Sequence, residues 1–82
     1  MAVMRTFARV TSTGREHPTE SDATWTVVTA KDGTNLLQVS TYGSDARVSE
    51  PKVSQTFQID KSIAFELVAA IFATFGPLES SN

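Results

Sequence analysis

Apolar and polar residues alternate along four stretches of the chain, the pattern of β-strands whose two faces meet different surroundings. The first stretch has Met4, Thr6, Ala8 and Val10 on one side. We predict strands over Met4 to Thr13, Ala23 to Ala30, Asn35 to Gly43 and Lys52 to Ile59. Gly14 to Asp22 and Ser44 to Pro51 between them have the composition of loops.

The second and third predicted strands are separated by Lys31-Asp32-Gly33-Thr34. Asp-Gly between two alternating stretches is the strongest short-range signal for a β-hairpin. These two strands are therefore expected to pair antiparallel.

The apolar period changes after Asp60, from that of a strand to that of a helix. The Asp60 carboxylate is suited to accept the first free helical amides, and Gly76-Pro77 is typical of a helix end. The stripe expected to pack on the sheet consists of Ala64, Leu67, Val68, Ile71 and Phe75. The predicted fold is α+β, one domain over residues 1–77 with a four-stranded antiparallel sheet and a C-terminal helix on one face, then a disordered tail over 78–82.

Length and composition limit what such a chain can do alone. Its 82 residues bury only about 60 to 65% of the surface that the unfolded chain exposes, and without cysteine no disulfide can add stability. A chain of this kind usually gains the missing stability by oligomerisation, so we expect a homodimer. The formal charge of -2 argues against a general polyanion binder. No secretory signal or membrane-spanning stretch is recognised, so we expect a cytoplasmic protein without membrane contact.

The predicted helix carries more apolar surface than one sheet can cover. Phe65 and Phe72, with Ala69 beside them, lie about 90° from the core stripe. Two explanations are open. Either the sheet curls round the helix and both rings belong to the monomer core, or they form the interface of a homodimer or with another protein.

The face of the sheet opposite the helix is expected to be polar and free of carboxylates. It would carry Arg5, Phe7, Arg9, Gln38, Ser40, Tyr42, Ser54, Thr56 and Gln58, with Arg47 and Lys52 at its rim. Arginine can bind phosphate, Phe7 or Tyr42 can stack on a base, and amides can contact base edges, so this composition suits single-stranded DNA or RNA. The alternative is that these residues are the ordinary solvent side of an antiparallel sheet.

The order of elements from Ala23 to Gly76 resembles that of the single-stranded-DNA-binding transcriptional coactivator PC4 family and its small bacterial relatives. The resemblance rests on the Asp-Gly hairpin, a loop with scattered basic residues, and the segment KVSQTFQID running into a terminal helix. It implies a curved sheet and helix that dimerise, with the sheets binding single strands. By the same resemblance, Tyr42, Arg47 and Lys52 are the positions that would contact the strand.

No signature of catalysis, metal binding or cofactor binding is found in the chain. The single histidine, His17, lies in a predicted loop beside Glu16 and Pro18, so a metal site would have to take all its ligands from one flexible segment. No nucleophile or phosphate-binding motif is present. Two non-enzymatic hypotheses follow. One is a homodimeric single-stranded nucleic-acid-binding protein, and the other is a protein-interaction module of plasmid or phage type that uses the helix or a strand edge.

Overall fold

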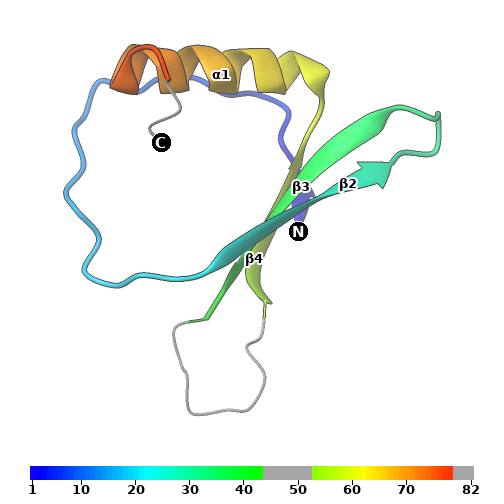
Figure 1. The fold of residues 1–82 in the computed structure, drawn as a ribbon, viewed down its shortest axis with the longest axis horizontal. Coiled ribbons are helices and arrows are strands. Elements are labelled where there is room, and N and C mark those ends of the chain that lie inside the picture. Colours follow the sequence, from blue (N-terminus) through cyan, green and yellow to red (C-terminus); the bar gives the residue numbers. More distant parts are fainter. Residues whose placement is uncertain (44–52, 79–82) are drawn as a thin grey trace.

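The computed structural model describes residues 1–43 and 53–78 and confirms an α+β fold (Figure 1). Its elements are β1 (Ala2–Val3), β2 (Ala23–Thr29), β3 (Asn35–Tyr42), β4 (Val53–Ile59) and α1 (Lys61–Phe75). The strands form one sheet in the order β1-β4-β3-β2. β1 runs parallel to β4 and the other pairs are antiparallel, so the sheet is mixed and not wholly antiparallel as predicted.

The β2–β3 hairpin forms where the Asp-Gly signal predicts it. Gly33 has a φ of 91°, a backbone conformation that favours glycine. The Ala30 amide donates to the Thr34 carbonyl at 2.8 Å and closes the turn. The Asp32 carboxylate accepts from the Thr34 amide at 3.0 Å and from its hydroxyl at 2.7 Å. The turn therefore fixes the register of the two strands.

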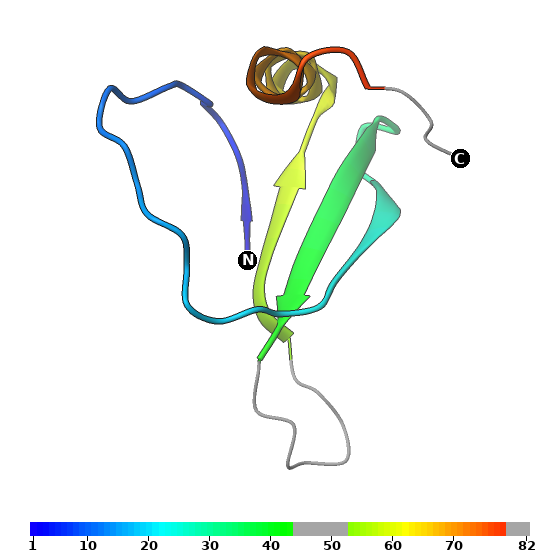
Figure 2. The same ribbon diagram turned by 60° about the vertical axis from the view of Figure 1, so that its left-hand side comes forward.

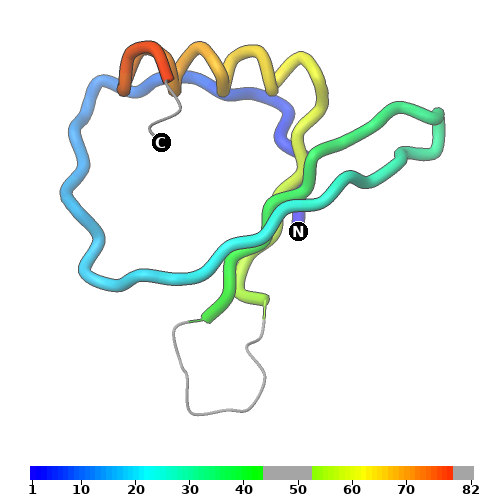
Figure 3. The backbone as a smooth tube through the Cα atoms, viewed as in Figure 1, coloured from blue at the N-terminus to red at the C-terminus, as the bar shows by residue number. Residues whose placement is uncertain are grey.

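The predicted strand from Met4 to Thr13 is wrong. Only β1 and the Met4 amide, which donates to the Gln58 carbonyl at 2.8 Å, pair with the edge of β4. The chain then leaves the sheet and makes a wide loop before it returns to β2 (Figures 1, 2 and 3). Alternation predicts an extended backbone but supplies no partner strand. The side expected to be apolar has small residues such as Ala8, so pairing along its whole length would bury little apolar surface.

The helix has the predicted limits. Asp60 caps its first turn, since the carboxylate accepts from the Ile63 amide at 2.9 Å. At the other end Gly76, with φ at 76°, donates its amide to the Phe72 carbonyl at 2.7 Å. Local capping chemistry thus sets both ends, as the sequence indicates.

The predicted packing of this helix on the sheet is wrong. Among sheet strands α1 contacts chiefly β4, and it projects from the end of that strand and does not lie across the sheet (Figures 1 and 2). Of the predicted stripe, Val68 and Phe75 are exposed. The reason is the connection, because Asp60 is the one residue between β4 and α1. With this short connection, α1 continues from the end of β4 and is not brought back over the sheet.

The core of the described residues is small and lies at the junction of β4 and α1. Its buried apolar residues are Ile59, 2% exposed, and Ile63, 4% exposed. The radius of gyration is 15.2 Å, whereas a compact domain of this length has about 12 Å. The predicted tail lies outside the described residues except for Leu78, which is exposed.

Candidate functional site

One face of the sheet is polar, as the alternation predicts, and its side chains are bonded to one another. Gln58 donates its amide to Gln38 at 2.8 Å, and the hydroxyls of Ser40 and Thr56 lie 3.0 Å apart. The hydroxyls of Thr24 and Tyr42 are also 3.0 Å apart. Each bond joins neighbouring strands in the register of the sheet or close to it. This polar face therefore stabilises the pairing of β2, β3 and β4.

The structure does not assemble the predicted nucleic-acid site as a unit. Gln38 and Tyr42 lie on the polar face, but Arg5, Phe7 and Arg9 belong to a segment outside the sheet. Arg47 and Lys52 lie outside the described residues. The described residues of β2, β3 and β4 on this face carry no charged side chain. The role of all seven residues in binding nucleic acid stays a prediction.

The opposite face of the sheet is apolar and open. The register aligns Trp25 with Val39 and Phe57, and Val27 with Leu37 and Ile59, so these six side chains share a face. Trp25 is 70% exposed and Val27 is 57% exposed. A hollow of about 440 Å³ lies over the β2 side of this face, lined by Ala23, Thr24, Trp25, Leu37 and Val39. Sequence reasoning missed this surface because it placed the helix over it.

The helix adds a second apolar surface. Phe65 is 68% exposed and Phe72 is 58% exposed, so the single chain does not bury these rings in its own core. Ala69 is also exposed. The predicted role of these three residues in a dimer or partner interface stays a prediction. A smaller hollow lined by Lys61, Ala64, Phe65 and Val68 lies along this side of the helix. We refer to the apolar residues of the open sheet face and of the exposed side of the helix together as the apolar surface. They are Trp25, Val27, Leu37, Val39, Phe57, Phe65, Val68, Phe72 and Phe75.

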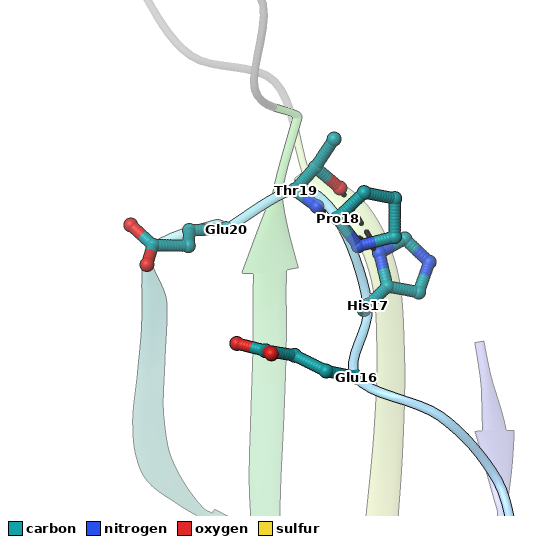
Figure 4. A pocket seen from close by; sticks show the side chains of 5 residues that line it. All are labelled: Glu16, His17, Pro18, Thr19 and Glu20. Carbon is teal, nitrogen blue, oxygen red and sulfur yellow. Dashed lines mark hydrogen bonds between the residues drawn. The ribbon is translucent and has the colours of Figure 1, made fainter.

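The segment around His17 contains polar groups near one end of the sheet (Figure 4). The Thr19 hydroxyl lies 3.1 Å from His17 Nδ1, which holds the imidazole within its own loop. Glu16 and Glu20 point away from the ring in Figure 4. Within residues 1–43 and 53–78, no group of three or more histidine, aspartate or glutamate side chains is placed to hold a metal ion.

Asp32 has a shifted pKa, and the cause lies in the hairpin turn. The backbone amide of Thr34, and then its hydroxyl, stabilise the charged carboxylate and lower the pKa of Asp32 below its usual value. This carboxylate accepts its hydrogen bonds from Thr34 within the turn. Its shift is explained by the structure of the hairpin and indicates no catalytic role.

Comparison of the chain with protein families, curated proteins and solved structures finds no match. The similarity to the coactivator family therefore rests on the residue pattern. In the described part of the chain, none of the helices has the length and apolarity needed to cross a membrane.

Proposed function

We propose that this chain is a small non-enzymatic protein-binding module that holds a protein partner on its apolar surface. The observation that carries the proposal is the exposure of Trp25 on an apolar sheet face that the chain's own helix leaves open. Large contiguous apolar patches on soluble domains mark interaction sites. Aromatic residues of this kind are also the side chains enriched where binding energy is concentrated.

Energetics favour a protein partner for this surface. Moving one large apolar side chain from water into an interface stabilises a complex by about 1.5 to 3 kcal/mol. Trp25, Phe65 and Phe72 each supply such a side chain. The polar face offers less binding free energy, because its hydroxyls and amides are bonded to each other and must break those bonds before they contact a ligand.

A pull-down with tagged protein from an extract of the producing cells tests this proposal. We expect capture that persists at high salt and falls at least about tenfold for Phe72→Asp, because a charge placed on an apolar interface must be desolvated. Ala73→Asp is the matched control, since it adds the same charge on the side of Glu66. Equal capture by both variants, or no capture by the wild type, would overturn the proposal.

Single-stranded nucleic acid remains the second candidate. It is favoured by the polar face, where Gln38 and Tyr42 lie among hydroxyls and amides without a carboxylate on the described strands. Fluorescence anisotropy with labelled single-stranded and double-stranded oligonucleotides at two salt concentrations tests it. Salt-sensitive binding that prefers single strands and weakens for Tyr42→Ala and Lys52→Ala would support this function. The absence of binding at low salt would exclude it.

A further inference from the structure

β2 lies at the edge of the sheet that the structure describes. The Tyr42 amide donates to the Asp22 carbonyl at 3.1 Å, and the Ala30 amide donates to the Thr34 carbonyl at 2.8 Å. Residues 22 and 30 therefore face β3, and hydrogen bonding alternates along an antiparallel strand. It follows that the residues between them with odd numbers direct their N–H and C=O groups outward. These are Ala23, Trp25, Val27 and Thr29.

This edge has none of the features by which strands avoid pairing with other chains. Natural edges are protected by charged residues, proline or bulges. The sequence of β2 is ATWTVVT, which has no charge and no proline, and its pairing with β3 runs without a register shift. Threonine, valine and tryptophan also favour strands. β2 is therefore suited to accept another strand.

The accessible surface of the chain is larger than that of a compact monomer of its mass. The chain exposes 7504 Å². A compact monomer of 8.9 kDa exposes about 4,800 Å², so the excess is about 2,700 Å². A standard interface covers about 800 Å² on each partner, and obligate homodimers cover more. Pairing with the β2 strand of a second copy covers the unprotected edge of both copies in one contact, whereas a foreign peptide would cover one edge and add its own open edge.

We propose that two copies of this chain pair antiparallel through β2, about a twofold axis at Thr26. This inference rests on the proposed function and names a second copy as the partner for the sheet part of the apolar surface. Centring the pair on Thr26 uses the whole strand and places Trp25 opposite Val27 of the second copy, and Ala23 opposite Thr29. All four outward residues of each copy then exchange backbone hydrogen bonds. The result is one continuous sheet of eight strands.

The same pairing joins the two apolar sheet faces. A twofold axis perpendicular to the sheet keeps the apolar face of each copy on the same side. Trp25 of one copy then packs beside Val27 of the other, twice, and aromatic with β-branched pairs are favourable across strands. The dimer thus begins to cover the two large apolar residues of the sheet that the single chain leaves most exposed.

A cysteine at the axis tests this arrangement. Thr26 faces its own counterpart as a pair without backbone hydrogen bonds, so the two Cα atoms are expected at about 4.5 Å, within the range for a disulfide. The natural chain has no cysteine, so each variant has a single thiol. Thr29→Cys is the matched control, because its two copies would lie about 20 Å apart along the strands.

After mild oxidation at micromolar concentration, we expect most Thr26→Cys protein as a covalent dimer, at least about fivefold more than for Thr29→Cys. Sedimentation of the wild type gives the assembly state, and circular dichroism verifies folding of each variant. A wild-type dimer with no preferential link at Thr26→Cys would overturn the β2 pairing but leave the proposed function standing. A wild-type monomer would overturn the pairing too, and the pull-down with Phe72→Asp would then decide the proposed function alone.

Discussion

The hydroxyl oxygens of Ser40 and Thr56 lie 3.0 Å apart across the β3–β4 pair. Ser40 is 6% exposed and is the buried polar residue among those described. Its hydroxyl therefore depends on Thr56 in place of water. The bond is one of the cross-strand contacts that make the polar face a structural part of the sheet.

Thr56→Val should reduce the free energy of unfolding by about 1 to 3 kcal/mol, because it leaves the buried Ser40 hydroxyl without its partner. The double variant Ser40→Ala with Thr56→Val should be closer to the wild type, since neither polar group remains. Urea unfolding of both single variants and the double variant measures this coupling. Purely additive losses would show that the two hydroxyls do not stabilise each other.

Asp60→Ala should reduce the free energy of unfolding by about 1 kcal/mol, because the Ile63 amide loses its acceptor at the start of α1. Asp60→Asn retains a side-chain oxygen and serves as the control. Thermal unfolding followed by circular dichroism at 222 nm compares the two variants. A similar loss for both would mean that charge, and not hydrogen bonding, is the main contribution of this residue.

The Asp32 carboxyl should titrate below its usual pKa, because the amide and hydroxyl of Thr34 stabilise its charged form. Since the pKa is lower in the folded state than in the unfolded state, the stabilisation is complete above the unfolded pKa. It is lost as the pH falls through the folded pKa. NMR titration of the side-chain carboxyl measures this pKa. Thr34→Val, which keeps the amide and removes the hydroxyl, should return the pKa part of the way toward its usual value.

Val27→Pro should weaken the proposed dimer at least about tenfold, because proline removes an N–H that points away from β3 and leaves the β2–β3 bonds in place. Val27→Thr keeps the N–H and the branched shape and is the control. Trp25 is the one tryptophan of the chain, so its emission reports on this interface directly. Dilution should shift the emission to longer wavelength at a higher protein concentration for Val27→Pro than for Val27→Thr. Identical dilution curves would exclude β2 as the dimer edge.

Local signals in the sequence predict the hairpin and the helix well. Asp32-Gly33 marks the turn and Asp60 and Gly76 mark the helix ends, because each acts on backbone within a few residues. The alternation in β3 and β4 also assigns Gln38, Ser40 and Tyr42 to one face correctly. These features depend on geometry that neighbouring residues determine.

Features that depend on distant partners are not predicted. Met4 to Thr13 alternates like a strand, yet whether it pairs is decided by what else lies beside β4. The apolar period of α1 identifies surfaces that must be buried but not what buries them. The sequence therefore identifies Phe65 and Phe72 as an apolar surface without showing what covers it. It gives no sign that Trp25 would also be exposed to solvent.

The single residue between Ile59 and Lys61 also has a consequence for protein engineering. Inserting a flexible linker of several glycines before Asp60 would keep the cap and free the helix to fold back on its own sheet. The apolar residues of the helix and those of the open sheet face would then meet within one chain, at an effective concentration in the millimolar range. The length of this connection, and not the apolar composition, would determine whether the helix and sheet residues cover each other within one chain or stay available to a partner.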